Sequence, residues 1–445
     1  MEFTIWDVLV DFSIISGLLL VGVLLRAKIV LIQKSFMPAS IIAGILGLIL
    51  GPYALDILPF TELIGSYPGL LIAFVFAALP FSTGKFKVKE VIGKVGGLWS
   101  YSQTIMLLFY GLGLLFALVF LAPFFTDLHN GFGLLLAAGF VGGHGTAAAI
   151  GDAFAQQGWE EATSIAMTSA TVGALTAISV GLVLIKRAAA KGHANYIQDF
   201  KRLPHGLRSG LLPDKEWDSM GESKVSSIVI DPLIYHVMFI VIATGIGYYL
   251  SVLGEELLPN VAIPAFSLAF IVALIIRLII EAFGADKYLD KEVFSKISGG
   301  ATDYLVAFGI ASINLTVVAQ NMVPFIILMI FGIVLAYVFY RFLSGYYFQE
   351  NWFEKGIFTF GWITGAVAMA IALIRVADPK QESETLDDFG LAYVPIAPVE
   401  IALITFGPLF IASGQHWLFV IITLVATIAI LLFSYSQGWV KKSRI

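Results

Sequence analysis

The chain has 445 residues, of which 59% are hydrophobic and 13% are charged, and its formal net charge is −5. Soluble globular proteins carry about 25% charged residues, so this composition excludes that class. The absence of cysteine excludes disulfides, thiolate metal sites and cysteine nucleophiles. Apolar runs of about 18 residues or more recur along the chain, each long enough to cross a bilayer as a helix, whereas a β-barrel would show shorter alternating segments. We therefore predict an all-α polytopic membrane protein.

Eleven apolar segments are predicted to cross the membrane. Lysine and arginine residues gather after each odd-numbered segment, while acidic residues occupy the other loops. By the positive-inside rule, this asymmetry places the N-terminus outside and the C-terminus in the cytoplasm, with the protein in the inner (plasma) membrane of the cell. The predicted segments are 5–25, 38–59, 67–83, 96–123, 160–187, 231–254, 261–284, 300–319, 322–346, 389–413 and 416–438.

The segment 130–157 does not fit this pattern as a crossing. It lies between a fourth segment that ends outside near Asp127 and a fifth that begins outside near Glu160. Two crossings need about 40 residues and this segment has about 28, so we predict a re-entrant hairpin. Glycine permits an unwound backbone, which is tolerated at membrane depth only where it lines a buried cavity. The predicted tip has the sequence GGHGT, formed by Gly142, Gly143, His144, Gly145 and Thr146.

The segment 355–378 behaves in the same way from the opposite face. It lies between a ninth segment that ends inside and a tenth that starts inside, and its predicted tip runs from Gly361 to Gly365. The alternative for both segments is that their glycines only permit close packing of helices. Two such segments at matching positions favour paired re-entrant hairpins, which in transporters indicate the substrate site.

The two hairpins divide the chain into similar halves. Residues 1–190 and 228–413 are predicted to be inverted repeats, each with five helices and one hairpin. The polar stretch 191–227 is predicted to be a cytoplasmic linker between them. The segment 414–445 carries an extra transmembrane helix, which has no counterpart in the first half.

Polar groups at the hairpins are the candidates for binding a substrate. His144 could donate a hydrogen bond to a carboxylate, or it could fix the loop by bonding backbone carbonyls. Arg375 presents a planar fork that matches a carboxylate, but it could also reach the membrane interface or pair with Asp378. Free N–H groups at the start of a half-helix suit an anion. The predicted substrate-binding residues are Gly142, Gly143, His144, Gly145, Thr146, Gly361, Thr364, Gly365 and Arg375.

Oxygen-bearing side chains are the candidates for binding a hard cation. Glu400 lies in the middle of the tenth segment, where it could bind Na⁺ or H⁺, or pair with Arg375. Asp152 could be a Na⁺ ligand or could equally form a structural bond between helices. Threonines in membrane helices often bond their own backbone instead of a ligand. Asn314 shares a helix face with Asp303, either as a ligand or as a contact between helices. The predicted ion-binding residues are Asp152, Thr168, Thr171, Asn314 and Glu400, and no transition-metal site is expected.

The stretch GGHGTAAAIGDAF, followed by GWEEATSIAMTSATVGALTA, resembles the first re-entrant loop and the next helix of the bacterial sodium/glutamate symporters. The arrangement of two halves with opposed hairpins is also similar to the 2-hydroxycarboxylate transporters. The second hairpin departs from the family, because Trp362 and Ile363 are bulky where the family's loop is small, and because Arg375 is basic. The matching positions are Gly142, Gly143, His144, Gly145, Thr146, Ala162, Ala166, Met167, Ala170, Thr171 and Gly173.

The resemblance implies a Na⁺-coupled symporter that imports an anionic amino acid, with glutamate as the first expectation. It also implies a homodimer that works by an elevator movement, in which a body that carries both hairpins slides against a scaffold. The partners would be the substrate, Na⁺ as the coupling ion and the bilayer. No other cofactor and no nucleic acid is implied.

Three other functions are weighed against this one. The same architecture could use H⁺, titrated by His144 or Glu400, to move another carboxylate or organic anion. A channel is the remote alternative, since channels are usually symmetric around a central path and do not need opposed hairpins in one chain. An enzyme is not expected, because the sequence contains no HExxH, no GxSxG and no matched pair of intramembrane aspartates.

Overall fold

The fold is seen in a computed structural model whose bounded elements are all helices. Ten helices within the described ranges are long and apolar enough to cross a membrane, which confirms the all-α polytopic prediction. Much of the predicted linker, 191–227, lies outside the described residues. The structure describes residues 4–34, 36–82, 88–194, 196, 209–214, 217, 219–257, 264–378 and 381–441.

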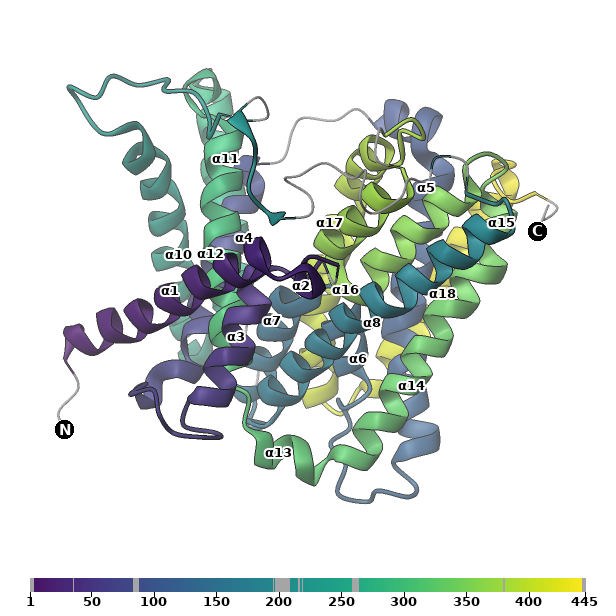
Figure 1. Cartoon of the computed structure of the whole chain (residues 1–445), viewed down its shortest axis with the longest axis horizontal. Helices are drawn as coiled ribbons and strands as arrows, with labels where there is room; N and C mark the ends of the chain where they lie inside the picture. The colour runs from purple at the N-terminus through teal and green to yellow at the C-terminus, as the bar shows by residue number, and fades with distance from the viewer. Residues whose placement is uncertain are drawn as a thin grey trace.

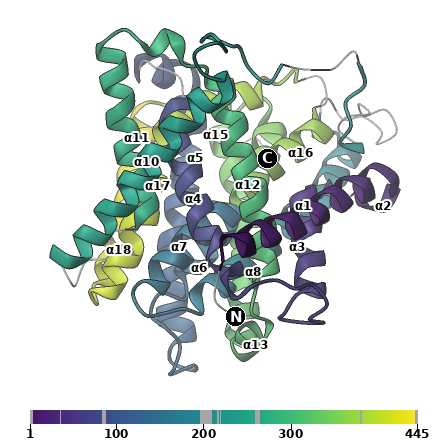
Figure 2. The same cartoon turned by 90° about the vertical axis from the view of Figure 1, so that its left-hand side faces the viewer.

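Seven helices form what we call the first group, on the left of Figure 1. In this group α4 packs against both α11 and α12, α3 packs against α1 and α12, and α10 packs against α11, as Figure 2 also shows for the last pair. Proline residues precede α3 and α11, where a missing N–H has no cost for the helix. The members are α1 (Ile5–Lys28), α2 (Val30–Lys34), α3 (Ala39–Leu50), α4 (Tyr67–Ser82), α10 (Pro232–Leu257), α11 (Ala265–Ala282) and α12 (Lys291–Ala311).

The second group of helices is built around α8 and α5: α8 packs against α6, α7 and α16, and α5 packs against α17 and α18. Figure 1 shows α5, α14 and α18 on the side away from α10 and α11. Apart from the five-residue α2, each half of the chain thus supplies three helices to the first group, and each supplies a helix, a hairpin and a helix to the second, to which the second half adds α15 and α18. The members are α5 (Val88–Phe116), α6 (Leu134–Phe140), α7 (Gly143–Ala155), α8 (Ala162–Ala190), α14 (Met322–Val338), α15 (Ser344–Tyr347), α16 (Trp352–Ala377), α17 (Thr385–Ala412) and α18 (His416–Ser436).

Two predicted crossings have different bounds in the structure. The segment predicted at 38–59 contains a helix of only 12 residues, after which the N–H groups of Ile57 and Leu58 bond back to the carbonyl of Leu50. The segment predicted at 300–319 was wrong at both ends, because the helix runs over Lys291–Ala311 and a separate short helix, α13, covers Leu315–Gln320.

Capping side chains explain the shifted bounds of α12 and α13. Asp290 accepts hydrogen bonds from the N–H groups of Glu292 and Val293, so α12 begins in a stretch whose charges had suggested a loop. Asn314 accepts from the N–H groups of Thr316 and Val317 and so starts α13. Polarity alone could not separate a capped helix start from a loop.

Both predicted hairpin segments are folded back on themselves. α6 and α7 pack against each other and are separated by a turn at Gly142 and Gly143. α16 is long enough to cross a membrane, yet its backbone leaves the helical region at Gly365 and Ala366. A Cβ placed on Gly361 would lie 2.8 Å from the Cα of Ala370, whereas nine residues of straight helix would span about 13 Å. The two arms of α16 therefore lie side by side.

Candidate functional site

The tips of the two hairpins meet inside the molecule. Gly143 at the first tip has φ +65°, and Ala366 at the second has φ +61°. A Cβ placed on Gly143 would lie 2.9 Å from the Cβ of Ala366. Two interrupted stretches of backbone, more than 200 residues apart in the sequence, are thus in contact. Near such tips, N–H and C=O groups that a continuous helix would bond internally are available to a ligand.

The helix α8 supports both hairpins through small residues. The first arm approaches it at Gly139, which lies against the backbone of Ser169 and Ala170. The second hairpin approaches it at Gly173, which lies against the carbonyl oxygen of Thr364. A larger residue at either glycine would hold the hairpin away from α8, so these close approaches position both tips.

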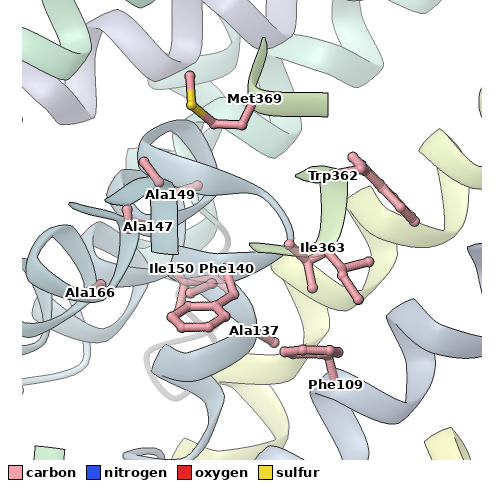
Figure 3. Close-up of a cluster of buried hydrophobic side chains, with 14 of the residues drawn as sticks. Phe109, Ala137, Phe140, Ala147, Ala149, Ile150, Ala166, Trp362, Ile363 and Met369 are labelled. Carbon is pink, nitrogen blue, oxygen red and sulfur yellow. The ribbon is translucent and has the colours of Figure 1, made fainter. Parts of the chain in front are cut away.

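Apolar side chains fill the space behind the tips. In Figure 3, Phe140 and Ile150 of the first hairpin lie together, and Phe109 and Ile363 lie to their right. The rings of Phe109 and Phe140 have centroids 6.3 Å apart. Trp362 is almost fully buried and packs edge-on against Phe389 of α17, with ring centroids 5.3 Å apart. The bulky residues of the second tip therefore belong to the packed core that holds the tip in place.

A cavity of about 1050 Å³ opens in front of the two tips and lies between the two groups of helices. Its walls are mostly apolar, which is typical of a small-molecule site with a few polar groups for orientation. The second group supplies the tips, part of α8 and one face of α17, and the first group supplies faces of α3, α4, α11 and α12. The polar side chains that line it are Ser40, His144, Thr146, Arg277, Thr302, Asp303, Tyr393 and Glu400.

His144 is bonded to α8 and is 7% exposed. Its Nε2 lies 3.2 Å from the hydroxyl oxygen of Thr171, and that hydroxyl lies 3.0 Å from the carbonyl oxygen of Met167. A hydroxyl has one proton. If Thr171 donates it to Met167, then Nε2 of His144 is the donor to Thr171. This arrangement favours the reading in which His144 fixes the loop.

Glu400 lies on the cavity wall formed by α17 and is 5% exposed. The hydroxyl of Tyr393 donates a hydrogen bond of 2.8 Å to its Oε2. The two residues are seven positions apart, about two turns along one helix face. The ring of Tyr393 also lies near Trp362, with centroids 6.5 Å apart, so this pair is joined to the second hairpin. The predicted alternative of pairing with Arg375 is replaced by the bond from Tyr393.

Two charged residues of the first group face the same cavity. Asp303 lies on α12 and Arg277 on α11. The Nε of Arg277 lies 3.0 Å from a carboxylate oxygen of Glu281, and its guanidinium also donates to the carbonyl of Pro80. Arg277 is therefore held at the end of the cavity where α4 and α11 finish.

Some predicted substrate-binding residues lie away from the cavity. Arg375 has an exposed side chain and is not among the cavity's lining residues. Gly361 is used in the packing of the two arms of α16. The hydroxyl of Thr364 donates to the carbonyl of Phe360, its own helix backbone, at 2.6 Å. The predicted residues that the cavity does bring together are Gly142, Gly143, His144, Gly145, Thr146, Gly365 and Glu400.

The predicted ion-binding residues are dispersed. Thr168 donates to the carbonyl of Ser164 at 2.7 Å, as threonines in membrane helices often do. Asp152 and Asn314 line a second cavity, of about 740 Å³, near the start of α4, whereas the first cavity reaches its end at Pro80. Among the described residues, no three His, Asp or Glu side chains are close enough to hold a metal ion.

Tyr393, Ala366 and Arg277 are cavity residues that the sequence reasoning missed. Tyr393 was detectable, because its spacing of seven places it on the same face of the tenth helix as Glu400. Ala366 gave no signal, since nothing in the sequence sets an alanine apart as a residue with positive φ. Arg277 was recognised only as part of the positive charge that set the topology.

The chain matches a family model described as the sodium/glutamate symporter, over residues 4–372. This range includes the first hairpin, the helix α8, every first-group helix and the second hairpin up to residue 372 of α16, which ends at Ala377. It ends before α17 and α18, which supply Tyr393, Glu400 and the helix packed against α5. No curated protein matches the chain significantly.

Proposed function

The chain belongs to the sodium/glutamate symporter family, and from this premise we propose that it is a Na⁺-coupled secondary active symporter that imports an anionic amino acid, with glutamate as the preferred substrate. The observation that carries the proposal is the contact between the two hairpin tips at the wall of one large cavity. Such a junction offers N–H groups to a carboxylate and C=O groups to Na⁺ without a dedicated charged side chain.

The substrate's carboxylate would bind at the backbone of the tips, near Gly142, Gly143, Gly145 and Gly365. α7 begins at Gly143 and has 13 residues, so its free N–H groups and its dipole favour an anion there. His144 would hold the first tip against α8 through Thr171 and so keep these N–H groups oriented. Na⁺ would be bound by tip carbonyls, since neither Thr168 nor Thr171 is among the residues that line the cavity.

Transport would use movement of the second group against the first. Both tips and Glu400 belong to the second group, so they can move together with a bound substrate. The cavity lies between the groups and reaches the ends of α4 and α11, which the charge pattern assigns to the cytoplasm. The position of this opening supports an inward-open state. We propose, as the family resemblance implies, that two inverted repeats with re-entrant hairpins work by an elevator movement in a homodimer of the inner membrane.

The test is uptake of labelled glutamate into proteoliposomes that contain the full chain. We expect uptake with an inward Na⁺ gradient at fixed pH, and little uptake when K⁺ replaces Na⁺. Unlabelled aspartate should compete, while citrate should compete weakly. Uptake that follows a proton gradient and ignores Na⁺ would overturn the coupling, and preferred uptake of citrate would overturn the substrate class.

A further inference from the structure

We propose that Glu400, held by Tyr393, binds the α-ammonium group of the substrate, so that the cavity selects amino acids over dicarboxylates that lack an amino group. The inference rests on the proposed function and names a recognition group that the function alone does not require. Both residues lie beyond residue 372, where the match to the family ends.

The first argument is that the Glu400 carboxylate needs a cation or further hydrogen-bond donors beyond the hydroxyl of Tyr393. The side chain is 5% exposed and lies on the cavity wall in the middle of α17. The Oε2 oxygen accepts from Tyr393, and within the described part of the chain no second donor and no ion pair is made to this carboxylate. An ionised carboxylate inside a membrane is costly unless a cation or further donors compensate it. An ammonium group supplies one positive charge and three donors.

The second argument is the charge pattern of the site. The tips present helix N-termini, which favour a negative group. Among the described cavity residues of the second group, Glu400 is the only carboxylate. The pair of Tyr393 and Trp362 connects the Glu400 position to the second hairpin. A positive tip region and a negative wall within one cavity match the two charged groups on the α-carbon of an amino acid.

The third argument separates Glu400 from Asp303, the other carboxylate at the cavity. Asp303 lies on α12, in the first group, and its side chain is exposed. A substrate bound to Asp303 would be held by both groups at once and could not travel with one of them. Glu400 shares the second group with both tips, so an ammonium bound there stays with the carboxylate site during the movement.

The experiment compares glutamate with glutarate, the same dicarboxylate without the amino group, in Na⁺-driven uptake and competition. The variant is Glu400→Gln, which keeps the shape and the bond from Tyr393. We expect the half-saturating glutamate concentration to rise at least about 10-fold, since a hydrogen bond to a charged group is lost. Competition by glutarate should stay unchanged or strengthen, and the Na⁺ dependence should stay unchanged. Asp303→Asn is the matched control and should keep the preference for glutamate.

Three outcomes would overturn the inference. The first is an equal loss of glutamate and glutarate in Glu400→Gln, and the second is a shift in its Na⁺ requirement, which would make Glu400 an ion ligand. The third is a wild-type protein that transports glutarate as well as glutamate. In that case the symporter function stands while the ammonium subsite fails. A wild-type protein with no Na⁺-driven uptake of any carboxylate would instead remove the proposed function, and the inference with it.

Tyr393→Phe keeps the experiment informative if Glu400→Gln folds poorly. It leaves the carboxylate in place and removes only the hydroxyl that holds it. We expect a smaller rise in the half-saturating glutamate concentration, of about 3-fold to 10-fold, with unchanged competition by glutarate. Equal losses for both compounds would contradict the assignment.

Discussion

The two hairpins make the same kind of turn with different residues. The first turns at Gly143, with φ +65°, where a glycine has no Cβ to strain. The second turns at Ala366, with φ +61° and ψ −179°, a conformation that is nearly restricted to glycine. Such a residue costs about 1–3 kcal/mol and persists only where its surroundings hold it. The first tip is therefore allowed by its sequence, while the second is imposed by its packing.

The two hairpins also make different contacts with α8. The first hairpin has a side-chain hydrogen bond to α8, between His144 and Thr171. The second meets α8 through the carbonyl of Thr364 against Gly173 and through Leu373 against Gly181. Both hairpins pack closely on α8, and the first adds a side-chain hydrogen bond to this packing. The predictions below test this contrast.

The largest effect is expected from Gly361→Leu in the second hairpin. Its Cβ would lie 2.8 Å from the Cα of Ala370, so the two arms could not close. Overpacking of this kind costs about 3 kcal/mol or more, and uptake should be lost with the tip. The unfolding midpoint in detergent and Na⁺-driven uptake are the measurements. Gly245→Leu on α10, where a Cβ meets nothing within 4 Å, is the control and should leave both unchanged.

The next effect is expected from Thr171→Val, which removes the partner of His144. A buried donor left without an acceptor costs about 1–3 kcal/mol, so the free energy of unfolding should fall by that amount. Thr364→Val is the matched change in the second hairpin and should cost less than Thr171→Val, because the buried Thr364 hydroxyl bonds its own helix backbone and its loss leaves no other side chain without a partner. Equal effects of the two substitutions would contradict the contrast in attachment.

A smaller loss is expected from Gly143→Ala. A side chain at φ +65° costs about 1–2 kcal/mol, and the new Cβ would press on Ala366 at 2.9 Å. The midpoint of thermal unfolding should fall, and the half-saturating concentration of the substrate should rise. Gly192→Ala, also at positive φ but with nothing within 4 Å, separates the backbone cost from the contact between tips. A larger loss at Gly192 would refute the contact.

The smallest effect, of opposite sign, is expected from Ala366→Gly. Relief of about 1–3 kcal/mol of backbone strain should outweigh the roughly 0.5–1 kcal/mol that glycine loses in chain entropy. The midpoints of these two ranges leave a net stabilisation of about 1 kcal/mol, to be measured by thermal unfolding. In the double variant with Gly143→Ala, the missing Cβ at 366 should also remove part of the Gly143→Ala loss. Destabilisation by Ala366→Gly would show that the second turn is not strained.

The sequence predicted both hairpins because two independent physical signals agreed. Positive charge must stay on one side of the membrane, so segments 130–157 and 355–378 could not be simple crossings. Glycines then marked where each segment could turn. The first turn lies at Gly142 and Gly143, inside the predicted tip, whereas the second lies at Gly365 and Ala366, at the end of the predicted tip, and Gly361 packs in one arm. The inverted repeats and the re-entry into the membrane remain predictions that the arrangement of the two groups supports.

Other features depended on contacts between distant parts of the chain. The start of α12 was missed because Asp290 caps it within a charged stretch. Arg375 looked like a carboxylate ligand, yet only the packing of α16 decides which way a helical side chain points, and this one is exposed. Glu400 was recognised as a buried carboxylate, but its bond from Tyr393 is seen only in the fold.

The sequence by itself determined the class of the protein, the two segments that turn back on themselves and the motif that indicates its family, because hydropathy, charge and glycine act locally. Only the tertiary structure decided that Gly143 and Ala366 touch, that both tips share one cavity with Glu400, and that Asp152 and Asn314 face another. Those facts follow from how helices far apart in the chain pack on α8 and across the two groups, and packing depends on the shapes of both partners.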